Sequence, residues 1–344
     1  MMNKNMVRLG KTEIVVPKNG FGALPIQRVT EDEAVYLLKK AYDYGIRFFD
    51  TARGYSDSEK KIGLALKEVR KDIIIATKTG AQNVDSFWKD LNTSLEMLQT
   101  DYIDIYQFHT PSFCPKPNDG TGLYEAMLEA KEKGMIKHIG LSNHKLAVAK
   151  EAIESGLYET IQFPFSYLAS DKDLQIVELC KEHDLGYIAM KALAGGLIDK
   201  ADVAYAYLAQ FDHVVPIWGV QRETELDDFL GCFDNPPELT KKRQEIIEKD
   251  KEMLAGNFCR GCGYCMPCPV GIQINSCARM SLLIRRAPSA MWLSEAWQEN
   301  MSKIEDCIHC NQCSSKCPYS LDTPKLLEEN LIDYKNIVEG KTKV

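Results

Sequence analysis

The chain has 344 residues and a formal net charge of −7 at neutral pH, with 45% hydrophobic and 26% charged residues. This composition is typical of a globular chain that is long enough for one large domain and one small one. It shows no basic excess, so we expect no nucleic-acid partner. The longest apolar runs, such as residues 73–76, are too short to cross a bilayer, and no signal-like segment opens the sequence. These features favour a cytoplasmic protein without a membrane partner.

Strand-like and helix-like segments alternate after a short stretch at residues 7–16 that is expected to form a hairpin. Eight short segments are rich in Ile, Phe, Tyr and Val, as expected for strands that are buried on both faces. They are Gly20–Ile26, Arg47–Thr51, Ile73–Thr79, Tyr102–His109, Ile136–Ser142, Ile161–Phe165, Tyr187–Lys191 and Val214–Gly219.

Helical patterns separate these strands. The run Thr30-Glu31-Asp32-Glu33 predicts a capping box at the start of a helix that continues to Gly45. Apolar residues also recur at helical spacing at positions 84–98 and 174–180. Eight strands alternating with helices favour an α/β fold of the (β/α)₈ or TIM-barrel type over residues 1–235. A doubly wound sheet is the alternative, but no Gly-x-Gly-x-x-Gly motif follows the first strand.

The run Asp234-Asn235-Pro236-Pro237 interrupts the alternation. We expect residues 236–256 to contain a connecting helix, from Glu238 to about Ala255, and residues 336–344 to form a loose tail. Between them, residues 257–335 are expected to form a small, mainly helical domain. Nine of the twelve cysteines lie in this region. Clustered cysteines without a secretory signal indicate metal or redox chemistry rather than a disulfide framework.

The clustered cysteines form two runs with regular spacing. The runs are Cys259-x2-Cys262-x2-Cys265-x2-Cys268-Pro269 and Cys307-x2-Cys310-x2-Cys313-x3-Cys317-Pro318. Three thiolates two residues apart can hold one face of a four-iron cubane, and in two-cluster ferredoxins the fourth ligand comes from the other run. We therefore expect two 4Fe-4S clusters.

The expected ligand sets follow from that exchange of fourth ligands. The first set is Cys259, Cys262, Cys265 and Cys317, and the second is Cys307, Cys310, Cys313 and Cys268. Zinc is the alternative metal, but zinc loops use two cysteines each rather than three. A single cluster is the other alternative.

Four reactive side chains follow successive strands of the expected barrel: Asp50, Tyr55, Lys78 and His109. Active sites of such barrels lie at the carboxyl ends of the strands, so these groups should converge. A nearby ammonium would lower the pKa of a phenol, and a carboxylate would hold that ammonium in place. A neutral imidazole could orient a carbonyl group. Such a set could protonate a carbonyl oxygen while hydride arrives at carbon.

At these residues the sequence resembles the aldo-keto reductase superfamily, from about residue 6 to residue 232. The resemblance lies in several short stretches in a specific order. They are Phe49-Asp50-Thr51 with Gly54-Tyr55, Thr77-Lys78, Phe108-His109, Gly140-Leu141-Ser142-Asn143 and Ile161-Gln162. The cysteine module resembles the ferredoxin-fused branch of that superfamily, in which a stretch like Met190–Gly196 also occurs.

The resemblance implies hydride transfer between NAD(P)H and a carbonyl or alcohol substrate. Tyr55 would be the general acid or base, Lys78 would tune it, Asp50 would pair with Lys78, and His109 would orient the carbonyl. The implied cofactor-binding residues are Gly22, Ser142, Asn143, Gln162, Lys191, Leu193, Gly195, Gly219, Val220, Arg222 and Asp228. Family habit favours NADP. Only Arg222 is basic where relatives bind the 2′-phosphate, so NAD remains open.

Two further hypotheses come from joining these two halves. Nicotinamide gives two electrons at once, whereas a four-iron cluster takes one. The chain could therefore be an electron-transfer reductase, in which a ferredoxin-like partner feeds the clusters and a flavin or substrate in the barrel receives the electrons. It could also be a non-catalytic redox sensor that binds nicotinamide. The intact set of four reactive side chains disfavours the sensor.

Overall fold

The computed structural model describes residues 5–254, 258–286, 289–317 and 319–342. Pro318, the end of the expected connecting segment at 255–256 and the end of the expected tail at 343–344 lie outside the described residues. The chain divides into two compact units. The first contains residues 1–192 and 201–240, and the second contains residues 193–200 and 241–344. Among the described residues, no helix has the length and apolar character needed to cross a membrane.

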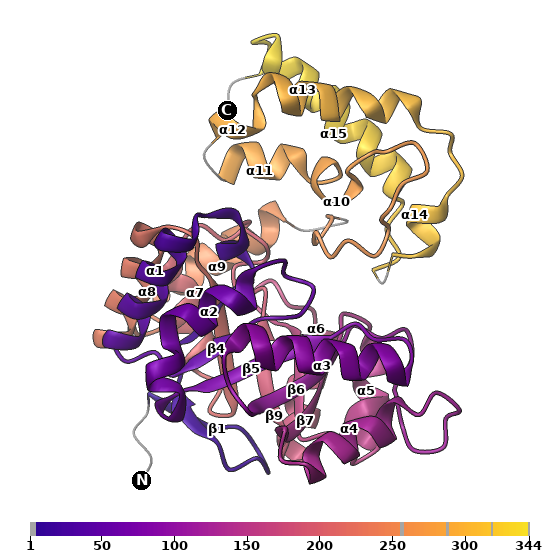
Figure 1. Cartoon of the computed structure of the whole chain (residues 1–344). Coiled ribbons are helices and arrows are strands. Elements are labelled where there is room, and N and C mark those ends of the chain that lie inside the picture. The colour runs from indigo at the N-terminus through magenta and orange to yellow at the C-terminus, as the bar shows by residue number, and fades with distance from the viewer. Residues whose placement is uncertain (1–4, 255–257, 287–288, 318, 343–344) are drawn as a thin grey trace. The chain divides into compact units, whose positions relative to one another are not determined.

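The first unit is a closed barrel of eight parallel strands, in the order β10-β3-β4-β5-β6-β7-β8-β9, with helices around it (Figure 1). This confirms the expected (β/α)₈ fold. The strands are β3 (Gly20–Gly22), β4 (Phe48–Asp50), β5 (Ile74–Thr79), β6 (Ile103–His109), β7 (Ile136–Ser142), β8 (Thr160–Pro164), β9 (Gly186–Met190) and β10 (Val214–Gly219).

Helices follow the strands along the chain. They are η1 (Pro25–Arg28), α1 (Glu31–Asp43), α2 (Ser58–Leu66), η2 (Lys67–Asp72), α3 (Val84–Leu98), α4 (Leu123–Glu132), α5 (Leu146–Glu154), α6 (Asp171–Glu182), α7 (Ala201–Leu208) and α8 (Glu223–Asp234). The predicted capping box at Thr30 is present, with reciprocal contacts between Thr30 and Glu33. The helix ends two residues before the predicted Gly45.

The first predicted strand, Gly20–Ile26, is too long. Strand β3 ends at Gly22, and Pro25 then opens the short 3₁₀ helix η1. Proline lacks an N–H for strand pairing, and its fixed φ suits the first position of a helix, so the apolar run leaves the sheet here. The other predicted strands agree with the structure to within one residue at each end.

The expected hairpin is formed by the antiparallel strands β1 (Met6–Arg8) and β2 (Val15–Pro17). Their buried residues Val7 and Val16 belong to one apolar cluster with Phe48, Ile105 and Ile217 of the barrel strands. Hydrophobic burial therefore fixes the hairpin against the interior of the barrel.

The second unit is mainly helical, as predicted. Its helices are α9 (Lys241–Met253), α10 (Ile274–Cys277), α11 (Met280–Arg286), α12 (Ser289–Trp292), α13 (Glu295–Ser302), η3 (Lys303–Asp306), α14 (Gln312–Ser315) and α15 (Thr323–Val338). Buried side chains from several of them, including Ile274, Cys277, Met301 and Leu327, form its apolar core. Cysteines of both predicted ligand sets contact this core. Hydrophobic packing and the cysteine loops are therefore parts of one small unit.

Candidate active site and cluster sites

The register of neighbouring strands brings the predicted catalytic residues to one end of the barrel. Asp50 is the last residue of β4 and Lys78 lies near the end of β5. His109 is the last residue of β6, and Tyr55 lies in the loop between β4 and α2. All eight strands are parallel, so their carboxyl ends meet on the same rim.

Asp50 and Lys78 form a buried ion pair, with side chains 3% and 1% exposed. Lys78 Nζ donates to both carboxylate oxygens of Asp50, at 2.8 and 2.7 Å, and to the carbonyl of Thr51 at 2.5 Å. Burial raises the pKa of Asp50 and lowers the pKa of Lys78, while the opposite charge of each partner acts against these shifts. The pair is thus held rigidly beside the barrel rim.

Tyr55 and His109 lie against one another beside this pair. Their ring centroids are 5.6 Å apart with an edge-on geometry, and Lys78 Nζ lies 5.4 Å from the centre of the Tyr55 ring. Burial, followed by the charge of Lys78, lowers the pKa of His109 to about 3. The imidazole is therefore neutral over the physiological range, as expected from the sequence, and it can donate a hydrogen bond without carrying charge.

The expectation that Lys78 lowers the pKa of Tyr55 is not met in this structure. Burial raises the pKa of the phenol, and the charge of Asp50 raises it further. The physical reason is that the phenol is buried and lies near the carboxylate of Asp50, and both conditions favour its neutral form. In this arrangement Tyr55 holds its proton firmly.

A chain of buried amides extends from Asp50 across the barrel interior. Gln162 Nε2 donates to Asp50 Oδ1 at 3.3 Å, and Gln107 Nε2 donates to Gln162 Oε1 at 2.7 Å. Gly140 provides space for Gln107, since a Cβ at that position would lie 2.8 Å from Gln107 Cγ. Sequence reasoning missed Gln107. Its signal was a polar residue inside an apolar strand.

Glu59 is a second residue that sequence reasoning missed. Its buried side chain accepts a 2.6 Å hydrogen bond from Thr77 Oγ1 and pairs with Arg53. Burial raises the pKa of Glu59. Thr77 precedes Lys78 and Arg53 lies two residues before Tyr55, so Glu59 ties together the two segments that carry the acid and its neighbouring cation.

Three of the expected cofactor-binding residues lie at adjacent strand ends. Ser142 pairs with His109 on one side and with Gln162 on the other in the sheet register. Asn143 braces its own loop, because its Nδ2 donates to the carbonyl of Pro111 and its Oδ1 accepts from the backbone of His144 and Lys145. All three polar side chains are buried.

Gly22 ends β3, and a Cβ there would lie 3.0 Å from the carbonyl of Trp218. A side chain at this position would press against the backbone of the neighbouring strand, so glycine suits this close approach of two strand ends. Buried polar groups and bare backbone at neighbouring strand ends fit the amide and ring of a nicotinamide.

The remaining expected cofactor residues lie in three places. Gly219 ends β10, with Val220 directly after it, and Lys191 follows β9 with a left-handed backbone, φ 55°. Leu193 and Gly195 belong to the second compact unit. Arg222 caps the N-terminus of α8, and the exposed Asp228 lies within that helix.

Arg222 is paired within its own turn. Its guanidinium donates to Glu225 Oε1, with Nε at 2.8 Å and Nη2 at 2.5 Å. Arg222 is the basic side chain of this turn, and its guanidinium is already paired with the Glu225 carboxylate. It therefore gives no distinct preference for a cofactor with a 2′-phosphate. The structure therefore leaves NAD and NADP both open.

The cysteines of the first expected set surround one cavity. Cys259, Cys262, Cys265 and Cys317 line it, together with apolar side chains such as Ile274 and Leu326. The backbone N–H of Gly261 donates to Cys259 Sγ at 3.4 Å. Four thiols, apolar walls and an N–H directed at sulfur are the features that protein sites for iron–sulfur clusters supply.

The second expected set surrounds a second cavity. Cys268, Cys307, Cys310 and Cys313 line it, with Cys265 contributing to both cavities. The two cavities are similar in size and are both lined by thiols and apolar side chains, so the two sites are built alike.

The two cysteine runs share a backbone pattern that was not predicted. Gly261 and Gly263 have left-handed φ angles of 63° and 82°, and the residues at the equivalent positions of the second run, His309 and Asn311, have φ of 50° and 55°. Turns of this kind direct successive N–H groups toward one anion. The equivalence indicates that the two loops are built alike, with His309 at a turn position.

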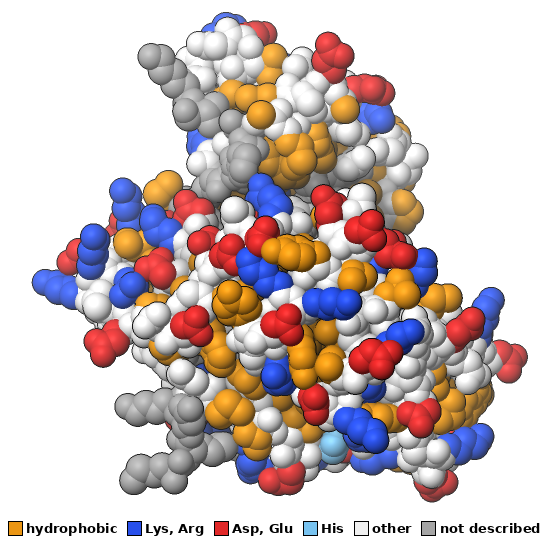
Figure 2. Space-filling view, turned by 60° about the vertical axis from the view of Figure 1, so that its left-hand side comes forward, with side chains coloured by type: hydrophobic (Ala, Val, Ile, Leu, Met, Phe, Trp, Pro, Cys, Tyr) orange, Lys and Arg blue, Asp and Glu red, His pale blue; other side chains and the backbone are white. Residues whose placement is uncertain are grey.

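Charged side chains of both signs are mixed over the visible face of the barrel (Figure 2). Figure 2 shows no large field of Lys and Arg on this face. This mixture agrees with the overall balance of 42 basic and 49 acidic residues.

Comparison with known proteins supports this interpretation of both units. The aldo/keto reductase family matches residues 18–203, and a 4Fe-4S dicluster domain matches residues 258–322. The methylglyoxal reductase DkgB of Escherichia coli O157:H7 is 33% identical over 263 residues, which cover 72% of this chain and 94% of that protein.

Solved structures show the same barrel. An aldo-keto reductase from Bacillus halodurans in its holo form has a TM-score of 0.63 at 23% identity and covers 72% of this chain and 96% of its own. An aldo-keto reductase from Klebsiella pneumoniae in complex with NADPH has a TM-score of 0.60 at 21% identity, with 72% and 95% coverage. At these identities the likeness shows the fold alone. These similarities give no support to the flavin that was considered from the sequence. The chain belongs to the aldo/keto reductase family of oxidoreductases and carries a C-terminal 4Fe-4S dicluster domain.

Proposed function

We propose that the chain is an NAD(P)H-dependent carbonyl reductase in which Tyr55 is the general acid or base and two 4Fe-4S clusters occupy the cysteine-lined cavities. The observation that carries the proposal is the convergence of the buried Asp50–Lys78 pair, Tyr55 and the neutral His109 at one barrel rim. The 33% identical relative is named a methylglyoxal reductase, which makes a small carbonyl compound the first substrate to test.

The four side chains divide the work of carbonyl reduction. The nicotinamide would supply hydride to the carbonyl carbon. Tyr55 donates its phenolic proton to the carbonyl oxygen, on which negative charge develops. His109 fixes the direction of that oxygen through a neutral N–H. Lys78 places positive charge beside the phenolate that Tyr55 becomes, and Asp50 and the Thr51 carbonyl keep Lys78 in position.

The raised pKa of Tyr55 keeps the phenol protonated before the substrate binds, but it also makes the proton harder to give up. Proton transfer therefore requires stabilisation of the phenolate as it forms. Once the proton has left, the phenolate would be the strongest acceptor near Lys78. The charge of Lys78 therefore acts more strongly on the transition state than on the resting phenol.

The chain offers two cysteine-lined sites in which four-iron clusters would supply one-electron redox chemistry. Cys259, Cys262, Cys265 and Cys317 would hold the first, and Cys307, Cys310, Cys313 and Cys268 the second. Thiolate ligands, apolar walls and backbone N–H groups near sulfur support this assignment.

The test of the proposed function is the variant Tyr55→Phe in protein purified without oxygen. Removing the phenolic proton should lower kcat for methylglyoxal reduction by about 10²- to 10⁴-fold, while the nucleotide Kd and the cluster absorbance stay unchanged. Tyr44→Phe is a matched control, since Tyr44 is 54% exposed at the C-terminal end of α1 and is assigned no role in the site. Full activity in Tyr55→Phe would contradict the proposed role. NADH and NADPH are compared in the same assay.

A second function, a reductase that exchanges electrons with a ferredoxin-like partner, is favoured by the exposure of the second cysteine loop. Cys310 is exposed, and the neighbouring Ile308 is 61% exposed. A cluster held by this loop would lie close to the protein surface. A partner protein could then approach it closely enough for electron transfer.

The variant Cys310→Ser separates the two functions. If electrons pass through this cluster, the variant should lose turnover even with saturating nucleotide. If hydride transfer alone sustains the reaction, the variant should keep turnover while its iron content falls. Iron and sulfide analysis with EPR spectroscopy reports the cluster independently of the assay.

A further inference from the structure

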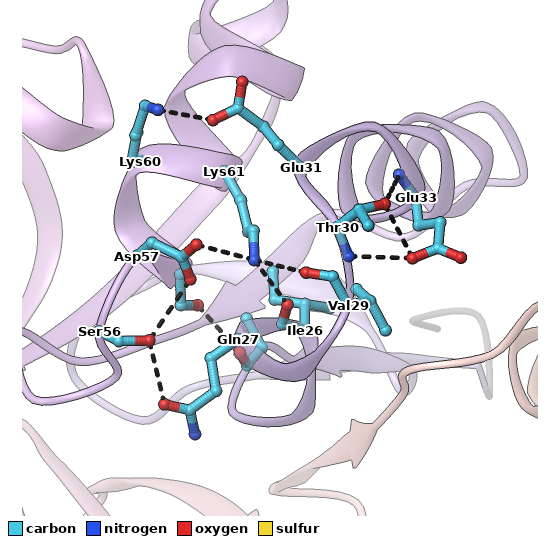
Figure 3. Close-up of polar contacts among 12 residues, drawn as sticks. Ile26, Gln27, Val29, Thr30, Glu31, Glu33, Ser56, Asp57, Lys60 and Lys61 are labelled. Carbon is cyan, nitrogen blue, oxygen red and sulfur yellow. Dashed lines mark hydrogen bonds and ion pairs between the residues drawn. The ribbon is translucent and has the colours of Figure 1, made fainter.

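Lys61 is a buried lysine of the barrel unit with three partners (Figure 3). It lies on α2, and its side chain is 2% exposed. Its Nζ donates to the carbonyls of Ile26 and Val29, at 3.0 and 2.8 Å, and lies 2.9 Å from Asp57 Oδ2. An ammonium has three protons, and these contacts use all of them. Such a complete set of partners is what makes burial of a lysine tolerable.

These contacts join two loops of the barrel rim. Ile26 and Val29 belong to the loop after β3, which contains η1, whereas Asp57 follows Tyr55 by two residues. Ser56 and Gln27 form a second link between the same loops, with Oγ and Oε1 3.2 Å apart (Figure 3). The loop after β3 is thus fastened to the loop that carries the proposed acid.

The start of the η1 loop is fixed by other groups. The Ala23 N–H donates to the carbonyl of Asp50 at 2.8 Å, and Ser58 Oγ donates to the carbonyl of Ala23 at 2.9 Å. Lys61 acts further along, at the last turn of η1 and the residue after it. Its removal would therefore release the far end of the loop while the strand end stays in place.

The Tyr55 loop has its own supports. The Arg53 N–H donates to the carbonyl of Lys78 at 2.9 Å, Thr51 and Ser58 share a 2.9 Å hydrogen bond, and Arg53 pairs with Glu59. None of these contacts involves Lys61. Loss of Lys61 should consequently disturb the η1 loop far more than it disturbs Tyr55.

We propose that Lys61 is a positioning residue that fixes the η1 loop as one wall of the carbonyl site, and that it acts on substrate binding rather than on proton transfer. The wall would present Leu24, 42% exposed, and Gln27, because β3 ends beside Asp50 at the rim. This inference rests on the proposed function. It names a residue for which neither the sequence nor the family motifs gave a role.

The experiment compares Lys61→Met with Lys60→Met. Lys60 is the adjacent residue of α2, is 51% exposed and pairs with Glu31 at 2.6 Å, so it controls for loss of a lysine at this helix. With 4-nitrobenzaldehyde as the probe and saturating NADPH or NADH, Lys61→Met should raise KM about tenfold with kcat within about twofold of wild type. Lys60→Met should leave both values unchanged.

Amide hydrogen exchange provides a readout that does not depend on turnover. In Lys61→Met, peptides that cover residues 24–29 should exchange faster, while those that cover residues 48–55 should keep their protection. Lys61→Arg, which keeps the charge and several donors, should restore much of the protection. It also keeps the test possible if Lys61→Met does not fold.

Three results would overturn the proposal. These are an unchanged KM with unchanged exchange at residues 24–29, a kcat that falls as far as KM rises, or exchange that speeds up equally across both loops. If the wild type reduces neither methylglyoxal nor 4-nitrobenzaldehyde, the proposed function itself is wrong. The loop fastening is then judged on exchange alone, where faster exchange at residues 24–29 supports it and unchanged exchange rejects it.

Discussion

The barrel rim and the cysteine loops hold their reactive groups in place in different ways. At the rim, several charged or polar groups are paired with one another within the chain, as with Asp50, Lys78, Gln162 and Gln107. In the second unit, eight cysteines instead line two cavities. A site whose groups satisfy one another is organised by folding alone. A site made of thiols that line a cavity would be completed by the metal cluster that they hold.

Iron removal should give the largest effect, because it affects only one of the two regions. Anaerobic chelation should release about eight iron atoms per chain from two four-iron clusters. It should make amides between residues 259 and 321 exchange rapidly, since the thiols lose what holds them together. Strands β4, β5 and β6 should keep their protection.

Cys277→Ser is the control for this experiment. Cys277 is buried in the apolar core and lines neither cavity, so this variant should retain its iron. Unchanged protection in iron-free protein would show that the second unit, like the barrel, is organised by folding alone.

Lys78→Met tests whether the rim is held together by pairing between its own side chains. The variant leaves the carboxylate of Asp50 buried without its partner, at a cost of about 3–5 kcal/mol in stability, and it should abolish carbonyl reduction. Without Lys78 the folded-state pKa of Asp50 rises further above its unfolded value. The penalty should therefore be largest at high pH and should shrink as pH falls toward that raised pKa.

Thermal unfolding at pH 8 and pH 6 measures this dependence. The double variant Lys78→Met, Asp50→Leu should recover stability without recovering activity. A single variant as stable as wild type at pH 8 would mean that the pair is not buried as the structure shows.

His109 provides a smaller effect with a definite sign. Its pKa is about 3 in the folded chain and ordinarily about 6.5 when unfolded, so the unfolded chain takes up a proton first. The contribution of His109 to the free energy of unfolding is fully present above pH 6.5. It is lost as pH falls toward 3, by at most about 1.4 kcal/mol per pH unit. Between pH 7.5 and 5.5, wild type should lose more stability than His109→Gln in chemical unfolding. Equal losses would place a charged imidazole at the rim.

Gln107→Met should have the smallest effect. It removes the donor to Gln162 Oε1, at a cost of about 1 kcal/mol, and should lower kcat less than tenfold because Gln162 still reaches Asp50. Gln210→Met, at an exposed helix end, is the control and should change neither value. A large loss of activity with no loss of stability would show that Gln107 orients the Asp50–Lys78 pair more strongly than expected for a residue that contacts it only through Gln162.

Short-range sequence patterns predicted much of this protein. Alternating apolar runs predicted the closed barrel, and polar residues at successive strand ends predicted where Asp50, Lys78 and His109 would lie. The spacing of the cysteines predicted two loops with matched sets of thiols. In each case the signal is local, because strand periodicity and ligand spacing depend on residues a few positions apart.

The tertiary structure alone decided the rest. Gln107, Glu59 and Lys61 derive their roles from partners 18 to 55 residues away, across strand register and helix packing. The pKa of Tyr55 is raised rather than lowered because burial and the negative charge of Asp50 favour the neutral phenol. Burial and the geometry of hydrogen bonds between distant segments exist only once the chain is folded, so no local pattern encodes them.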